Sequence, residues 1–447
     1  MRSVEDQLTA VVDAAVAPEP IRVALTDALG LMCAEEVTST TQVPGFPQAA
    51  VDGFAVRAVD VGGSAGLRRP ERRDATKEGP EGPEGEEGTE GADSEAPADP
   101  PVARERALPV VGEVPAGSQK PLRLQPRQAV RVATGAPLPT LADAVLPLEW
   151  TDRGRKRVTP QRPVRTGDFV RKPGDDIQPG DIAVRQGSVL GPAQIGLAAA
   201  AGRDKLLVYP RPRVTVMSYG LELVDLDRTP GLGQVYDIAS YVVAAAAREA
   251  GADVHRAGIV NAEPRRMRET VAGHIAKSEF VVITGAVGGS GAAPMQEILR
   301  ELGEVDTTRV AMHPGSVQGF GLLGDERTPT FLLPSNPVSA LVIAETFIRP
   351  AIRRSLGKTA VTRRTVKARS LRELDSIPGR RGFIRARLMR DADSGEYLVE
   401  PLSALEAGPT HLLAGFAEAN AMVHLPEDAI HVRPGDIVDV EFLHQRS

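Results

Sequence analysis

The chain has 447 residues, of which 42% are hydrophobic and 25% charged, which is enough sequence for two to four globular domains. No apolar run reaches the ~20 residues that a bilayer-spanning helix needs, so we expect no membrane insertion. The single cysteine, Cys33, excludes a disulfide framework and a cysteine-based zinc site. The first residues do not follow the pattern of a signal peptide, and a cytoplasmic location is therefore expected.

Most of the negative charge comes from one segment. Residues 78–100 contain nine acids and no base, and without them the formal net charge changes from −6 to +3. The surrounding stretch, 71–103, is rich in Gly, Pro and Glu and predicts a disordered acidic loop. A tolerated solvated loop and a partner-binding arm both fit this composition. The remainder has no basic stripe, which argues against a nucleic-acid partner.

The first predicted elements are helices. Apolar residues recur at helical spacing in 4–16 and 23–37, so we expect residues 1–42 to be largely helical. Short β-like pieces separated by turn residues follow and predict a β-rich domain over 51–164. A short helix is expected to end at Gly202. Residues 1–50 and 165–205 would then form one discontinuous N-terminal domain that carries the β-rich domain as an insert.

From residue 206 onward, strands alternate with helices of 10 to 15 residues, among them an expected strand at 305–312. This alternation predicts a central parallel α/β sheet with helices on both faces, over 206–357. Residues 358–447 are β-rich again and predict a C-terminal β-barrel, with a small sandwich as the alternative. Ligands of such α/β sheets bind beyond the carboxyl ends of the strands. The loops to inspect are 218–224, 284–294, 313–318 and 334–337.

Four stretches, taken together and in this order, resemble the MoeA/gephyrin E-domain family of molybdopterin molybdenumtransferases. They are "VPGFPQAAVDGFAVRA" (43–58), "VRVATGAPLPTLADAVLPLE" (130–149), "VRKPGDDIQPGD" (170–181) and "FLLPSNPVSALV" (331–342). The resemblance also includes residues 211–224, 280–297, 310–317 and 416–427, so it covers nearly the whole chain. The chain resembles a divergent member of this family, of an actinobacterial-like or a gephyrin-like type.

The resemblance implies a multidomain α/β subunit that forms a head-to-tail homodimer. The family's site lies in a cleft between the central domain of one subunit and the N-terminal lobes of the other. The implied activity is the Mg²⁺-dependent insertion of molybdate into adenylylated molybdopterin with release of AMP. Such chemistry needs carboxylates for the metal ion and N–H groups, hydroxyls or cations for the anions.

Three residues match catalytic positions of the family: Asp52, Thr134 and Glu222. The resemblance implies a metal site formed by Asp175, Asp176 and Glu222. Each has a simpler explanation, because Asp before Gly is common in turns, Thr134 could cap a turn, and Asp175 and Asp176 lie in a Pro/Gly turn. Glu222 could be an acid favoured at the start of a helix.

A second set is expected to contact the molybdopterin substrate. It comprises Gly285, Gly288, Gly289, Ser290, His313, Ser316, Pro334, Ser335, Asn336 and Pro337. The glycine-rich loop "TGAVGGSGAAP" (284–294) could place backbone N–H groups against a phosphate, or its glycines could serve tight packing between a strand and a helix.

Several positions depart from the family pattern. An acid is replaced by Leu221, the loop aspartate by Ala293, and two lysines by His313 and Ser316. The loss of two charge-assisted bonds to an anion would cost ~3–6 kcal/mol, unless an arginine such as Arg309 replaces them. A neutral His313 is expected at cytoplasmic pH. The alternative function is a catalytically weakened, gephyrin-like dimeric scaffold that binds a protein partner.

Overall fold

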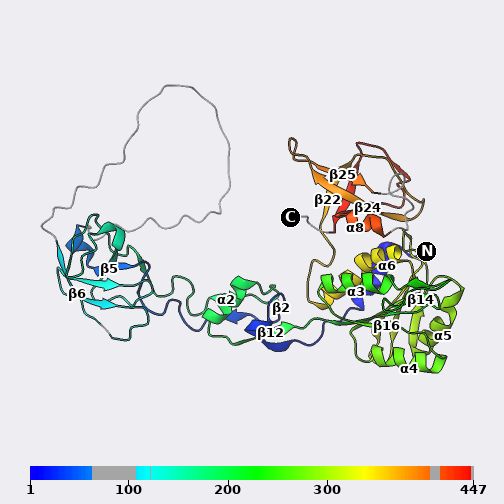
Figure 1. Cartoon of the computed structure of the whole chain (residues 1–447), viewed down its shortest axis with the longest axis horizontal. Helices are drawn as coiled ribbons and strands as arrows, with labels where there is room; N and C mark the ends of the chain where they lie inside the picture. The colour runs from blue at the N-terminus through cyan, green and yellow to red at the C-terminus, as the bar shows by residue number, and fades with distance from the viewer. Residues whose placement is uncertain (63–106, 121, 403–412, 444–447) are drawn as a thin grey trace, which may run out of the picture. The chain divides into compact units, whose positions relative to one another are not determined.

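The computed structural model describes residues 1–62, 107–120, 122–402 and 413–443 (Figure 1). The predicted acidic loop 71–103 lies outside the described residues. The chain divides into two compact units. The first unit comprises Met1–Glu36, Val184–Gly196 and Asp204–Ser447, and the second comprises Val37–Ala183 and Leu197–Arg203. The finer division into four domains stays a prediction.

The second unit is built on a sheet that buries both of its faces. Its strands, in spatial order, are β8 (Ala144–Pro147), β5 (Gly53–Val56), β7 (Ala129–Val132), β6 (Leu108–Val114) and β9 (Arg157–Val158). Phe54 and Leu146 pack on one face, whereas Ala55 and Val145 pack on the other. This alternation follows from the two-residue period of a strand. The short helices η2 (Ala58–Val61) and η4 (Leu148–Trp150) follow β5 and β8.

Two small ladders pair segments that are far apart in the sequence. One pairs β4 (Gln48–Ala49) with β10 (Val170–Arg171), and the other pairs β3 (Val37–Thr38) with β11 (Ile182–Val184). The stretches before and after the β-rich sheet therefore lie side by side. The helix α2 (Pro192–Ala200) ends before Gly202, as predicted.

The predicted helix over 23–37 is wrong. The structure has β1 (Ile21–Ala24), η1 (Leu25–Asp27) and β2 (Met32–Cys33) there, and both strands pair with β12 (Lys205–Tyr209). The apolar spacing fits a helix, but the backbone hydrogen bonds are satisfied by a strand distant in sequence, which overrides local propensity. The helix predicted over 4–16 is found as α1 (Val4–Asp13), capped by Ser3.

The first unit contains a mixed sheet with a parallel majority. Its order is β16 (Asp253–Ile259), β13 (Arg213–Ser218), β17 (Phe280–Thr284), β21 (Thr328–Leu333), β20 (Gly319–Leu323) and β18 (Gly303–Asp306). The first four strands are parallel, as predicted, while β20 and β18 extend the sheet as antiparallel strands that were not anticipated. The strand predicted at 305–312 is wrong, since β18 and β19 (Met312–His313) are separate.

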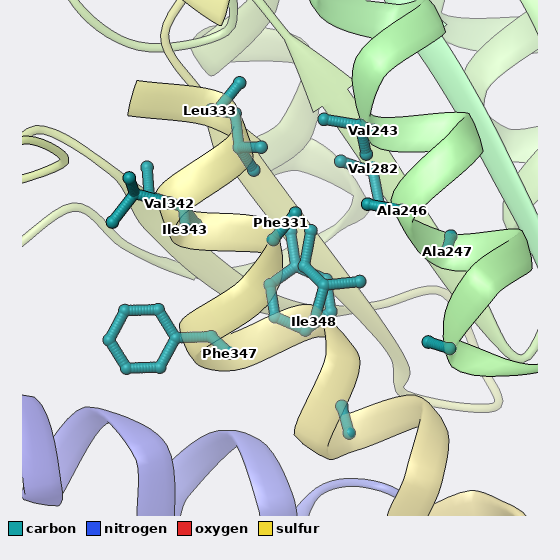
Figure 2. Close-up of a cluster of buried hydrophobic side chains, with 14 of the residues drawn as sticks. Val243, Ala246, Ala247, Val282, Phe331, Leu333, Val342, Ile343, Phe347 and Ile348 are labelled. Carbon is teal, nitrogen blue, oxygen red and sulfur yellow. The ribbon is translucent and has the colours of Figure 1, made fainter. Parts of the chain in front are cut away.

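Helices cover both faces of this sheet (Figure 1). One face carries α1, α3 (Ala239–Ala250), α6 (Pro337–Ile343), the π-helical turn η6 (Ala344–Ile348) and α7 (Arg349–Ser355). The other face carries α4 (Pro264–Ile275) and α5 (Ala293–Leu302), preceded by η5 (Ser290–Ala292). Figure 2 shows the first face, where side chains of α3, α6 and η6 meet Phe331 and Leu333 of β21.

The C-terminal strands close into the expected barrel. They follow the order β24 (Arg381–Arg390), β25 (Tyr397–Pro401), β22 (Thr365–Ser370), β28 (Ile437–Phe442) and β26 (Ala421–Leu425), and β26 pairs back onto β24. The short elements β23 (Leu374–Asp375), β27 (His431–Val432) and α8 (Ala414–Glu418) complete this part. Within the described ranges, no helix combines the length and hydrophobicity that a bilayer crossing requires.

Candidate functional site

Asp52 and Thr134 form a hydrogen-bonded pair in the second unit. Asp52 precedes β5 and Thr134 follows β7, and the antiparallel register Gly53↔Val132 brings the two together. The N–H and the hydroxyl of Thr134 both donate to Asp52 Oδ1, over 2.7 and 2.8 Å. These two hydrogen bonds, the backbone one first, lower the pKa of Asp52. The result is an exposed carboxylate that is charged at neutral pH, and its second oxygen has no hydrogen-bond partner among the residues that the structure describes.

Asp175 and Asp176 lie in a turn that is tied to its own neighbours. The N–H of Lys172 donates to Asp175 Oδ2 over 2.6 Å, and Asp176 forms an ion pair with Arg171. The preceding strand β10 pairs with β4, three residues ahead of Asp52. The structure therefore brings this turn and Asp52 to the same part of the unit, while giving both turn acids structural partners.

The glycine-rich loop follows β17, and its first glycine serves packing. Gly285 has φ +80°, and a Cβ there would lie 1.8 Å from the carbonyl oxygen of Tyr219. Its N–H donates to the carbonyl of Leu333 over 2.8 Å. Of the two explanations for the glycines, tight packing therefore accounts for Gly285.

The next glycines are different. Gly288 and Gly289 have φ +81° and +89° and are exposed, and a Cβ added to Gly289 would meet no atom within 4 Å. Their backbone conformation favours glycine, but no close packing demands it. Contact with a ligand therefore remains a possible role for Gly288 and Gly289, which lie just before η5 and α5. Ser290 lies in η5, its side chain being outside what the structure describes, and Ala293 begins α5.

Glu222 lies in the neighbouring loop after β13. The peptide of Gly220 is held from both sides by Asn261, whose Nδ2 donates to Gly220 O over 2.6 Å and whose Oδ1 accepts from Gly220 N over 3.3 Å. The Glu222 carboxylate is exposed, and the described part of the chain gives it no side-chain partner. Leu221 beside it is 82% exposed.

His313 and Ser316 have neither the positive charge nor the exposure of a lysine. His313 is half-buried, and burial followed by the nearby Arg380 lowers its pKa, so the imidazole is neutral at neutral pH. It lines a cavity of about 790 Å³ that is otherwise formed largely by the C-terminal strands and α8. Ser316 is buried, and its Oγ has no hydrogen-bond partner among the described residues.

The loop 334–337 lies beside the glycine-rich loop. A Cβ placed on Gly288 would lie 3.9 Å from Pro334. Asn336 caps α6, its Oδ1 accepting the N–H of Ser339 over 2.9 Å, and Pro337 is the first residue of that helix. Ser335 is exposed. The asparagine therefore has a structural role, and Pro334 and Ser335 are the members nearest to the glycine pair and to solvent.

Three of the predicted loops meet at one edge of the parallel sheet. The N–H of Tyr219 donates to Thr284 O over 2.8 Å, and Gly285 is bonded to Leu333. Thr284 Oγ1 is buried there, and no partner for it occurs in the described ranges. Loops 218–224, 284–294 and 334–337 are thus neighbours, as expected for the carboxyl ends of β13, β17 and β21.

A polar network beside Glu222 was not predicted from the sequence. Asp225, Asp237 and Tyr241 converge on Arg256 of β16. The one available signal is that Asp237 precedes a helical pattern, where an aspartate caps a helix; its Oδ1 does accept the N–H of Ser240. The connection to Arg256 comes only from the pairing of β13 with β16.

Family models cover most of the chain. "MoeA N-terminal region (domain I and II)" matches residues 2–202, "Probable molybdopterin binding domain" matches 215–354, and "MoeA C-terminal region (domain IV)" matches 367–443.

Individual proteins agree with these matches. The chain is 54% identical over 445 residues to "Molybdopterin molybdenumtransferase 1" of Mycobacterium tuberculosis H37Rv, with 100% of both sequences covered. It is 33% identical to "Molybdopterin molybdenumtransferase 2" of the same strain, over 98% of this chain and 99% of that protein. The crystal structure of the MoeA protein from Pyrococcus horikoshii superposes with a TM-score of 0.73 at 27% identity, covering 99% of each chain. The chain therefore belongs to the MoeA family.

Proposed function

We propose that this chain is a molybdopterin molybdenumtransferase, which inserts molybdate into adenylylated molybdopterin and releases AMP during molybdenum cofactor biosynthesis. The observation that carries the proposal is the Asp52–Thr134 pair, a charged and exposed carboxylate fixed by two hydrogen bonds. It lies within the stretches that resemble the family. The relative with 54% identity is named "Molybdopterin molybdenumtransferase 1".

The reaction breaks a phosphoanhydride bond and transfers an oxyanion to sulfur, so negative charge must be bound and redistributed. Asp52 supplies a fixed, charged carboxylate that can coordinate a metal ion. The exposed backbone of Gly288 and Gly289 offers N–H groups for phosphate oxygens. The unpartnered hydroxyls of Thr284 and Ser316 are further candidate donors within the described part of the first unit.

We propose Mg²⁺ as the metal ion of this reaction, where it would neutralise charge on the phosphate oxygens. In the described residues, no three His, Cys, Asp or Glu side chains form a ready metal site. Mg²⁺ commonly takes only one or two protein carboxylates and completes its shell with water and substrate phosphates. Asp52 of the second unit and Glu222 of the first each have, among the described residues, an unengaged carboxylate oxygen, so either one can supply a single ligand of this kind. Asp176 fits less well, since it is paired with Arg171.

We further propose that the chain acts as a homodimer in the cytoplasm. The proposal is supported by the membership of the chain in the MoeA family, for which we expect a head-to-tail homodimer. Sedimentation of the purified chain tests the dimer, and a monomer at micromolar concentration would contradict it.

A complementation experiment tests the activity. Cells that lack their own molybdenumtransferase receive this chain, and nitrate reductase activity is measured. Rescue by the chain, and its loss with Asp52→Asn, is the expected result. The purified protein is tested in parallel with adenylylated molybdopterin, molybdate and Mg²⁺, and AMP release is recorded.

A folded, dimeric protein that neither rescues nor releases AMP would contradict the proposal. The replacements Leu221, Ala293, His313 and Ser316 would then favour the alternative of a dimeric scaffold for a protein partner. Measurements on one preparation of protein therefore distinguish the transferase from the scaffold.

A further inference from the structure

The loop that carries Glu222 makes a long excursion from the sheet. The loop begins after β13 and forms the short ladder of β14 (Leu223–Val224) and β15 (Val235–Tyr236). It ends at α3, the helix that packs on the sheet. Asp225 and Asp237 stand at the two ends of the excursion 226–236. The excursion itself is largely exposed, so its conformation depends on what holds these two ends.

Arg256 of β16 contacts both ends. Its Nη2 lies 2.7 and 2.6 Å from the two carboxylate oxygens of Asp225, and its Nη1 lies 3.5 Å from Asp237 Oδ2. Its guanidinium carbon lies 3.9 Å from the centre of the Tyr241 ring, and the Tyr241 hydroxyl in turn donates to Asp225 over 2.9 Å. The arginine side chain is only 16% exposed. One partly buried cation therefore joins both ends of the loop.

Arg256 is the cation nearest to the Asp237 end among the described residues, and its contact there is the longer of the two, at 3.5 Å. The Asp237 side chain is 1% exposed, and its carboxylate also accepts hydrogen bonds from Ser218 and Ser240. A buried carboxylate that loses its charged partner is costly, because neutral hydroxyls do not compensate for its lost hydration. Removal of Arg256 would therefore disfavour the position in which Asp237 closes the loop.

Glu222 is connected to the returning strand of the loop through the backbone. The N–H of Val235 donates to the carbonyl of Glu222 over 2.8 Å, and the N–H of Asp237 donates to the carbonyl of Val224 over 2.9 Å. A shift of Asp237 is therefore transmitted to Glu222 through two backbone hydrogen bonds.

We propose that Arg256 is a positioning residue, which closes the base of loop 226–236 and thereby fixes Glu222 for the reaction. The functional half of this statement rests on the proposed transferase activity. The structural half does not, and the two are tested separately.

The structural half is tested by limited proteolysis of the full-length protein. Arg228 is an exposed trypsin site within the loop. Arg256→Gln is expected to raise the rate of cleavage after Arg228 at least tenfold, and Arg256→Lys, which keeps the charge, is expected to raise it less. The matched control is Arg213→Gln on the neighbouring strand, which removes an arginine paired with Glu279 over 2.7 Å. Equal cleavage in Arg256→Gln, Arg213→Gln and the unchanged chain would overturn the proposal.

The functional half is tested by a double-mutant cycle. Arg256→Gln is expected to lower kcat about 10²-fold, because a displacement of about 1 Å at a reacting group has effects of that size. The control Arg213→Gln should stay within about twofold. In the background Glu222→Gln, where no carboxylate remains to be positioned, Arg256→Gln should cost little more, since residues that act together are not additive.

Additive losses in this cycle would show that Arg256 acts independently of Glu222, and would overturn its positioning role. If the unchanged chain has no transferase activity, the proposed function fails, while the cleavage after Arg228 still decides whether Arg256 holds the loop. Arg256→Lys keeps both tests informative if Arg256→Gln fails to fold.

Discussion

The candidate residues of the two units differ in the charge that they fix. In the second unit, Asp52 is exposed and its negative charge is stabilised by two hydrogen bonds from Thr134. In the first unit, His313 stands where the resemblance leads us to expect a lysine, and its burial keeps it neutral. Neutral donors remain there, namely backbone N–H groups and buried hydroxyls. Asp52 therefore offers a fixed negative charge, whereas His313 and the groups around it offer neutral hydrogen-bond donors.

The largest effect is expected from Asp52→Asn. If Asp52 serves the reaction as a carboxylate, its loss should lower kcat by roughly 10² to 10⁴-fold, the usual contribution of a positioned acid or base. The amide keeps the size of the side chain, so the fold should be unaffected. AMP release under single-turnover conditions is the measurement.

The matched control is Asp152→Asn in the same unit. Asp152 is also exposed and accepts the N–H groups of Thr159 and Gly154. Its partial burial raises its pKa, but these hydrogen bonds outweigh that effect and leave the pKa lowered. The replacement should leave AMP release within about twofold. Equal losses of AMP release in Asp52→Asn and Asp152→Asn would mean that Asp52 is only a turn residue. The difference in charge between the two units would then not matter for the reaction.

The next effect separates packing from ligand contact in the glycine-rich loop. Gly285→Ala should lower the free energy of unfolding by roughly 2–5 kcal/mol, from left-handed strain and from the clash with Tyr219. Gly289→Ala carries the strain without the clash and should cost about 1–2 kcal/mol. Urea unfolding of both variants is the measurement. A larger loss of stability for Gly289→Ala would reverse the roles assigned to the two glycines.

A smaller effect is expected from His313→Lys, which returns a cation to the first unit. If this position faces the anion, the Kd for molybdate should fall about tenfold, because a charge-assisted bond contributes ~1.5–3 kcal/mol and partial burial beside Arg380 reduces that gain. His313→Gln, which is neutral at every pH, is the control and should leave the Kd unchanged. Titration calorimetry with sodium molybdate decides. An unchanged Kd for the lysine variant would show that His313 does not face the anion, although it lines the cavity.

The smallest effect concerns the pKa of Asp52. Thr134→Ala removes the hydroxyl donor but keeps the N–H, so the pKa of Asp52 should rise towards its ordinary value. A lowered pKa stabilises the fold at pH values above the unfolded pKa, ~3.9, and this contribution is lost as the pH falls through the folded pKa. The variant should therefore lose part of that dependence, and the acid limb of its pH–rate profile should move to higher pH.

Carboxyl carbon shifts in NMR measure this pKa directly. Thr134→Ser keeps a hydroxyl and should behave like the unchanged chain. A pKa that is the same in Thr134→Ala and Thr134→Ser would show that the backbone N–H alone sets it.

The family, the parallel strands of the central sheet and the candidacy of Asp52, Thr134 and Glu222 could be predicted from the sequence, which also narrowed the C-terminal part to a barrel or a small sandwich. Those features are carried by local motifs and by hydrophobic period, which are readable in one dimension. The apolar spacing also predicted a helix over 23–37 that does not exist. That spacing carries no information about β12, nearly two hundred residues away, whose strand pairs with this backbone and satisfies its hydrogen bonds.

Which polar groups are neutral, paired or exposed could not be read from the sequence and follows from the three-dimensional fold. Residue 53, directly after Asp52, has to be a glycine because a Cβ there would lie 2.2 Å from Leu146 O on the neighbouring strand. The sequence alone does not reveal this constraint. Arg256 contacts the ends of the loop after Glu222 only because its strand, β16, pairs with β13. Burial and hydrogen bonding depend on segments that are distant along the chain, and they set the charge and orientation on which the chemistry depends.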